Sequence, residues 1–176
     1  MDHKADYRAV TLADFYQRLM KSGRHFSIAL TLPKSDPKSY RLFCRMVWQV
    51  LDGRYTTVMI AEEIAGAQTS PGKATEEWGT LVREGRKFGL VILGTSQRAQ
   101  EIDKTIFTQV NDKYIGTHDI RDARYIAKLV GLQQWEVSTL GIGEFYRKRL
   151  GPSEPIRIDI KLGKLRNTEK IVKSNL

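Results

Sequence analysis

The stretch Thr57-Val58-Met59-Ile60-Ala61-Glu62-Glu63 decides the fold, because a short apolar run ends abruptly in two adjacent carboxylates. Such a run is typical of a buried strand, and ionised carboxylates are costly to bury without partners. At the end of a strand in an α/β sheet, the pair can do chemistry: one carboxylate holds Mg²⁺ through water, and the next orients or activates a nucleophilic water. The alternative is an ordinary polar exit into a surface loop.

A second apolar run, Leu90 to Leu93, is followed by Gly94 and the polar cluster Thr95-Ser96-Gln97-Arg98. Functional groups of open parallel sheets gather at the carboxyl ends of the strands. We therefore expect the carboxylates at 62 and 63 to lie on the same edge as residues 95–97. A Gln amide both donates and accepts hydrogen bonds, so Gln97 can sense a terminal phosphate or position a water. A plain polar loop is again the alternative.

The pattern of apolar residues predicts alternating helices and strands, which favours the α/β class with a mostly parallel sheet covered by helices on both faces. The strands at 58–61 and 90–93 are apolar throughout, so we expect both to be central and buried. Two antiparallel strands, over 141–146 and 155–160, are predicted to form a C-terminal β-hairpin. The remaining expected helices are 12–20, 39–51, 74–86, 102–110 and 122–129, and the remaining strands are 26–32 and 113–117.

The composition, with 41% hydrophobic and 28% charged residues among 176, is that of an ordinary folded protein. No apolar run approaches the roughly 20 residues that cross a bilayer, and the first residues lack a secretion signal. A single cysteine, Cys44, cannot form an internal disulfide. These features predict a cytoplasmic protein without a membrane partner. The three histidines, at 3, 25 and 118, are scattered, which argues against a metalloenzyme.

Lys and Arg exceed Asp and Glu by 29 − 20 = 9, which favours a polyanionic partner such as DNA over generic solubility. We expect a domain over residues 1–162 and a mobile basic tail over 163–176. The basic residues near this end are the candidate nucleic-acid contacts: Lys161, Lys164, Arg166, Lys170 and Lys173.

Four segments resemble, in order and spacing, the C-terminal three-quarters of a HerA/FtsK-type ATPase domain. They are residues 2–7, 58–63, 85–98 and 119–124 leading to 143–145. The family comprises hexameric, RecA-like P-loop motors that translocate or package DNA, including conjugative and viral members. The resemblance therefore implies a RecA-like sheet, a homo-oligomeric ring, and ATP and Mg²⁺ as cofactors.

The resemblance also implies roles for individual residues. Glu62 stands at the magnesium-associated Walker B position, where the family usually has Asp, and Glu63 stands at the catalytic Glu. Gln97 matches the sensor Gln, and Arg86 matches the arginine finger that acts on a neighbouring subunit. Thr95 and Ser96 are expected beside the nucleotide. Two further arginines match polar and basic positions near the subunit boundary: Arg121 and Arg124.

The family's Walker A loop should precede residue 2 by a few dozen residues, so its strand and loop are expected to be missing here. A lookalike at 32–39 has Lys-Ser after a strand, but Leu32 and Pro37 replace both glycines. Proline has no N–H with which to hold phosphate, so a surface turn capped by Ser39 is the better interpretation. In a RecA-like sheet the missing strand would be internal, and three explanations for its absence stay open. The sheet is rearranged, a second chain supplies the P-loop, or the chain is truncated.

These observations predict an ATPase-derived module for DNA translocation or packaging in a phage or mobile element. We expect nucleotide binding to be impaired, and ATP hydrolysis by the chain to be weak or absent. The alternative is a non-catalytic basic module that binds DNA or mediates oligomerisation.

Overall fold

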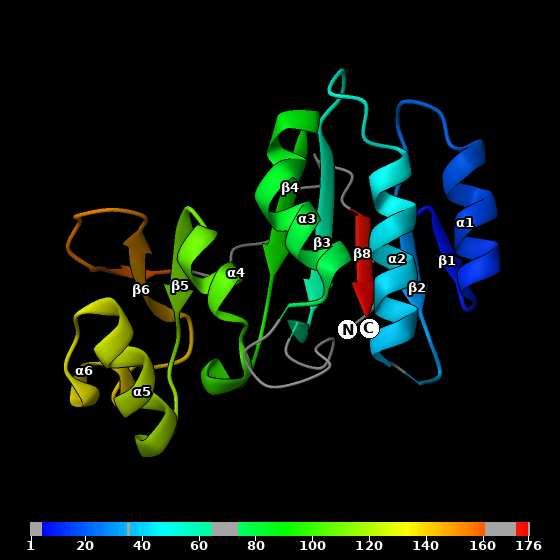
Figure 1. Ribbon diagram of the computed structural model, residues 1–176. Coiled ribbons are helices and arrows are strands. Elements are labelled where there is room, and N and C mark those ends of the chain that lie inside the picture. Colours follow the sequence, from blue (N-terminus) through cyan, green and yellow to red (C-terminus); the bar gives the residue numbers. More distant parts are fainter. Residues whose placement is uncertain (1–4, 35, 65–73, 161–171, 176) are drawn as a thin grey trace. The chain divides into compact units, whose positions relative to one another are not determined.

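The computed structural model describes residues 5–34, 36–64, 74–160 and 172–175, with Thr105 and the strand at 172–175 described by their backbone alone (Figure 1). The chain divides into two compact units. Unit 1 comprises residues 1–97, 102–106 and 168–176, and unit 2 comprises residues 98–101 and 107–167. Within the described ranges, no helix has the length and apolar character required to pass through a bilayer.

Unit 1 is built on a five-stranded sheet with the order β1-β2-β8-β3-β4. Every strand pairing in it is parallel. The strands are β1 (Tyr7–Ala9), β2 (Ile28–Thr31), β3 (Thr57–Glu62), β4 (Leu90–Gly94) and β8 (Val172–Asn175). The helices are α1 (Leu12–Lys21), α2 (Pro37–Gln49), α3 (Glu76–Glu84) and the 3₁₀ turn η2 (Gly85–Phe88). The predicted α/β class with a mostly parallel sheet is confirmed.

The helices α1, α2 and α3 lie on one face of this sheet. Each connects a strand to the next in the same direction along the sheet, and right-handed crossovers therefore place all three helices on the same side (Figure 1). Their packed residues are mainly aromatic: Phe15 contacts Phe43 with ring centroids 5.2 Å apart, and Tyr40 contacts Trp78 at 5.4 Å. These four side chains form much of the core of unit 1, because each is at most 2% exposed.

The starts of α1 and α2 follow from their capping residues. Thr11 caps α1 by accepting a hydrogen bond from the Asp14 N–H, and Asp36 caps α2 by accepting from the Ser39 N–H. The predicted start of α2 at Ser39 is therefore wrong by two residues. Pro37 takes the first helical position, where its fixed φ suits the helix and its missing N–H costs nothing.

The strand β4 lies at the end of the described sheet, so the expectation that residues 90–93 form a central strand is wrong. Its side chains alternate accordingly: Leu90 is buried, whereas Val91 and Leu93 are 45% and 50% exposed. A run of apolar residues cannot distinguish a strand buried on both faces from one that is covered by helices on one face.

Unit 2 contains an antiparallel three-stranded sheet of order β5-β6-β7. The helix α5 packs a buried face, including Ala123, Ile126 and Val130, against Val137 of α6. The predicted antiparallel pair near the C-terminus is thus confirmed as β6 and β7. The elements of unit 2 are η3 (Ala99–Glu101), β5 (Asp112–Ile115), α5 (Ile120–Val130), α6 (Gln134–Ser138), β6 (Glu144–Arg149) and β7 (Ile156–Asp159). The helix α4 (Lys104–Gln109) is divided, since its first three residues belong to unit 1 and the rest to unit 2.

Four short elements of the described structure were not predicted: β1, η3, α6 and β8. The four residues Val172–Asn175 belong to the segment expected as a mobile basic tail, and that expectation is wrong for them because they pair with β2 and β3. The other residues of the expected tail lie outside the described ranges.

Candidate active site

The candidate site lies at the carboxyl edge of the unit 1 sheet, meaning the edge where β3 and β4 end. Glu63 directly follows β3 and is the one described non-glycine residue with a left-handed backbone, at φ 50°. This conformation costs about 1–2 kcal/mol in residues other than glycine. Two backbone hydrogen bonds clamp the turn: Thr95 N–H donates to the Ala61 carbonyl at 3.0 Å, and Ile64 N–H donates to the Thr95 carbonyl at 2.9 Å.

The strained turn directs the Glu63 carboxylate to the polar residues after β4. One oxygen accepts a hydrogen bond from the Ser96 hydroxyl at 2.9 Å, and the other accepts from the Gln97 backbone N–H at 3.2 Å. The structure therefore brings Glu63 together with Ser96 and Gln97, which follow it by 33 and 34 residues in the sequence. All three lie at the sheet edge at which the sequence analysis expects them. Strained backbone conformations of this kind cluster at functional sites.

Glu62 and Thr95 complete this edge. Glu62 is the last residue of β3, is half-buried, and stands in register with Asn175 of β8. Thr95 and the Gln97 side chain are exposed to solvent. Across the described ranges, no group of three or more His, Cys, Asp or Glu residues is arranged to hold a metal ion. Magnesium coordination by Glu62 therefore stays a prediction. In the predicted site, nucleotide phosphates and water supply the other ligands of the ion.

Arg86 lies at the opposite edge of the same sheet. It is an exposed residue of η2, which follows α3 and leads into the amino end of β4. The five residues of β4 then separate it from Thr95, a span of about 16 Å at roughly 3.3 Å per residue. Arg86 and Glu63 of one chain are thus not neighbours, and the predicted finger role requires a second subunit.

The turn between β2 and α2 also ends at the carboxyl edge, but its geometry does not suit a phosphate. The Asp36 carboxylate accepts hydrogen bonds from the Ser39 hydroxyl at 2.7 Å and the Ser39 N–H at 3.0 Å. These bonds lower the pKa of Asp36. A helix N-terminus that holds its own carboxylate repels a second anion, which agrees with the prediction that this lookalike is not a P-loop.

The candidate nucleic-acid residues are not assembled into a surface by the described structure. Lys161, Lys164, Arg166 and Lys170 lie outside the described ranges, and Lys173 is part of β8, in register with Ile60. The two arginines matched to a subunit boundary, Arg121 and Arg124, are both exposed on α5 of unit 2.

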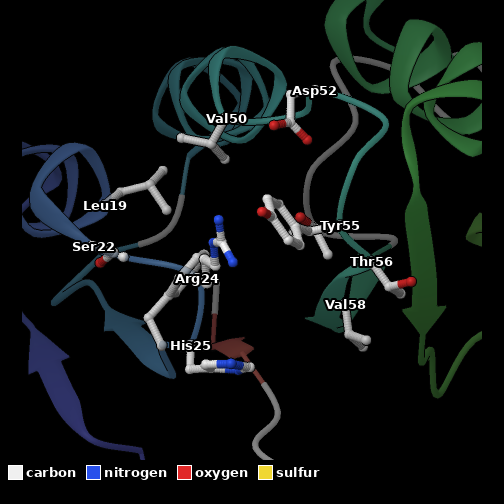
Figure 2. Close-up of a pocket in the computed structure, with 12 residues that line it drawn as sticks. Leu19, Ser22, Arg24, His25, Val50, Asp52, Tyr55, Thr56 and Val58 are labelled. Atoms are coloured by element: carbon white, nitrogen blue, oxygen red, sulfur yellow. The ribbon is translucent and has the colours of Figure 1, made fainter.

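A cavity of about 400 Å³ at the amino edge of the unit 1 sheet was not predicted from the sequence (Figure 2). The loop before β2 contributes Arg24 and His25, and the loop before β3 contributes Asp52 and Tyr55. Arg24 lies over the Tyr55 ring, with its guanidinium carbon 5.3 Å from the ring centroid. Arg24 and Tyr55 are 55 − 24 = 31 residues apart in sequence and share no motif, so only the sheet topology brings them together.

The α/β fold of this chain is similar to the folds of two solved proteins. One is the genome packaging NTPase B204 from Sulfolobus turreted icosahedral virus 2 in complex with AMPPCP, with a TM-score of 0.73 and 16% sequence identity over 90% of this chain and 75% of that one. The bacterial conjugative coupling protein TrwBdeltaN70 is a more distant match, with a TM-score of 0.55 and 11% identity over 71% of this chain and 36% of that one.

A relative in sequence is Protein P9 of Pseudoalteromonas phage PM2, which is 33% identical over 144 residues, or 79% of this chain. The match spans 65% of the length of Protein P9. No known family model matches the chain.

Proposed function

We propose that this chain is an ATPase-derived module of a phage DNA-packaging or DNA-translocating machine, and that the carboxyl edge of unit 1 is its nucleotide site. The observation that carries the proposal is the hydrogen-bonded contact of Glu63 with Ser96 and Gln97. The packaging-NTPase fold, the similarity to a phage protein and the net charge of +9 support the DNA-related setting.

In this proposal, Glu63 is the general base that activates the attacking water. Its carboxylate is held in place by two donors, which fixes the oxygens without neutralising their charge. Glu62, one residue earlier, binds Mg²⁺ through water, and the exposed Gln97 amide senses the terminal phosphate. Thr95 and Ser96 line the nucleotide. Arg86, at the opposite edge, reaches the nucleotide of an adjacent subunit in a ring, where its planar guanidinium stabilises charge on the transferring phosphoryl group.

Hydrolysis by this chain is expected to be slow, because the 176-residue sequence contains no G-x-x-x-x-G-K-[ST] loop. Backbone N–H groups of such a loop hold the phosphates in place, and positioning accounts for much of phosphoryl-transfer catalysis. Magnesium-dependent ATP binding, with little turnover, is the expected behaviour.

The test measures ATP binding by calorimetry, ATP turnover, and DNA binding at several salt concentrations. In Glu63→Gln, turnover should fall by about 100-fold or more, because a general base is lost, whereas ATP and DNA binding should persist. Arg86→Ala should lower turnover only at protein concentrations at which the chain oligomerises. DNA binding that weakens steeply with salt, in a chain that does not bind ATP at any Mg²⁺ concentration, would instead support the alternative of a non-catalytic DNA-binding module.

A further inference from the structure

In the described part of the chain, helices cover one face of the three-stranded sheet of unit 2. Ile115 of β5 belongs to the core that α5 and α6 complete, and Tyr146 of β6 packs against this core. The two residues stand opposite each other in the ladder, so they mark the covered face. Since side chains alternate between the two faces of a strand, the residues next to them in sequence lie on the other face.

This second face, called the open face below, carries aromatic, basic and apolar side chains. Its members pair across the three strands in successive rows: Asp112, Arg149, Tyr114, Arg147, Ile156, Phe145 and Ile158. Tyr114 and Ile156 are 53% and 64% exposed, and the Arg149 side chain is 66% exposed. A contiguous exposed surface with aromatic and apolar side chains is a typical site of interaction.

The charges of the open face favour an anionic partner. Arg147 donates its Nε–H to the Asp112 carboxylate at 2.7 Å, and Arg149 Nε lies 3.6 Å from the same oxygen. One carboxylate therefore faces two guanidinium groups, which leaves a net positive charge at this end of the sheet. An apolar protein surface placed here would remove the whole cluster from water, at a cost that the ion pairs do not reliably offset. A polyanion would instead gain the second guanidinium group as a partner.

Two aromatic rings of the open face have a spacing that suits the bases of a single strand. Tyr114 pairs with Arg147, which is two residues from Phe145, so the two rings are diagonal neighbours on β5 and β6. Diagonal neighbours are about 7–8 Å apart. Successive bases of a duplex strand are only about 3.4 Å apart, so the rings match bases that are splayed rather than stacked on each other. Gly116 gives the Phe145 ring room, since a Cβ there would lie 3.2 Å from it.

We propose that the open face of unit 2 binds single-stranded DNA. Bases stack on Tyr114 and Phe145, and the phosphates between them contact Arg147 and Arg149. Every base has a face that can stack, so binding depends only weakly on sequence. The choice of DNA rests on the proposed function. The surface belongs to unit 2 and needs no nucleotide, so DNA binding here and ATP binding at the carboxyl edge of unit 1 can fail separately.

The experiment measures the fluorescence anisotropy of a labelled oligothymidine of about 12 nucleotides titrated with the full chain, without ATP. Tyr114→Ala should weaken binding about tenfold because a stacking surface is lost, whereas Tyr114→Phe keeps the ring and should bind like the unchanged protein. Tyr16→Ala is the matched control, because Tyr16 is a partly exposed tyrosine of α1 in unit 1 and should not affect binding. Equal affinities for the Tyr114→Ala and Tyr16→Ala variants would overturn the proposal.

A second pair of variants tests the charges. Arg149→Gln should weaken binding and reduce the slope of log affinity against log salt by about 0.7, as expected when one phosphate contact is lost. Arg157→Gln removes the same charge from the covered face, where Arg157 pairs with Glu144, and should leave the slope unchanged. Arg149 is exposed, so this pair decides the question if Tyr114→Ala does not fold. Equal slopes in both variants would overturn the proposal.

Competition identifies the form of the nucleic acid. An unlabelled single strand should displace the probe, and a duplex of the same length should do so about tenfold less well, because its bases are not available for stacking. A duplex that competes as well as the single strand would overturn the proposal. So would a Tyr114→Ala variant whose only change is loss of self-association in sedimentation, since the open face would then join two copies of the chain.

Discussion

Replacing Glu77 with Gln should destabilise unit 1 and make the loss depend on pH. Glu77 lies in the first turn of α3, and its side chain is only 10% exposed. Its carboxylate accepts hydrogen bonds from Arg41 Nε at 2.8 Å and Nη2 at 3.0 Å, and from Arg45 Nη2 at 2.7 Å and Nε at 3.0 Å. Both arginines belong to α2, so this cluster joins α2 to α3.

The hydrogen bonds from Arg41, followed by those from Arg45, lower the pKa of Glu77 from 4.5 to about 2. The two values differ by about 4.5 − 2 = 2.5, which corresponds to at most about 3.4 kcal/mol of stability. The arginine side chains are 44% and 60% exposed, so solvent screens part of this energy. We therefore expect Glu77→Gln to cost about 1–2 kcal/mol at pH 7.

The pH dependence follows from the direction of this change. A carboxyl whose pKa is lower in the folded state stabilises the fold above pH 4.5, and the stabilisation disappears as the pH falls toward 2. Urea denaturation of both proteins between pH 7 and pH 2.5 should therefore show the difference shrinking with acidity. The neighbouring exposed residue supplies the control, since Glu76→Gln should cost less than about 1 kcal/mol. A Glu77→Gln difference that is constant across this pH range would refute the reasoning.

Three further outcomes test the unit 1 sheet and its connections. Gly89→Ala should lower the free energy of unfolding, measured in urea, by about 2 kcal/mol or more. The φ of Gly89 is 80°, and the added Cβ would lie 2.4 Å from the Tyr55 carbonyl oxygen. A loss below about 0.5 kcal/mol would contradict that geometry. Burial raises the pKa of the Cys44 thiol far above its ordinary value, so a thiol reagent at pH 8 should react only as the protein unfolds, and fast labelling of the native protein would contradict this. Glu63→Gly and Glu63→Ala both remove the carboxylate. The glycine variant should be about 1 kcal/mol more stable on thermal unfolding, since glycine tolerates the left-handed φ of this position. Equal melting temperatures would show that the backbone at position 63 is not strained.

Much of unit 1 follows from the sequence. Two apolar runs, one before Glu62 and one before Thr95, predict two parallel strands with polar ends. Neighbouring parallel strands end at the same edge of a sheet, and this holds for any arrangement of the helices that connect them. The contact of Glu63 with Ser96 and Gln97 is a consequence of that pairing. The apolar spacing and the capping residues also predicted the helices of unit 1. The predicted start of α2 differs from the observed start by two residues.

Other features depend on contacts that no local pattern encodes. The position of β4 at the end of the described sheet depends on which strands pair, and its five residues read the same in either position. The strand β8 is polar and short, so nothing in Val172–Asn175 marks it as interior to a sheet. Likewise, Asp36 and Ser39 are both good capping residues, and the choice between them depends on where Pro37 can begin the helix.

Whether the ends of β3 and β4 form one nucleotide site is tested most directly by titrating Mg²⁺-ATP into the ¹⁵N-labelled chain and following its backbone amide signals. The signals of Glu63, Ser96 and Gln97 should shift together, with a common dissociation constant, and Arg86 should follow only when subunits associate. Shifts confined to other parts of the chain, or signals of these three residues that do not move at saturating nucleotide, would contradict the assignment.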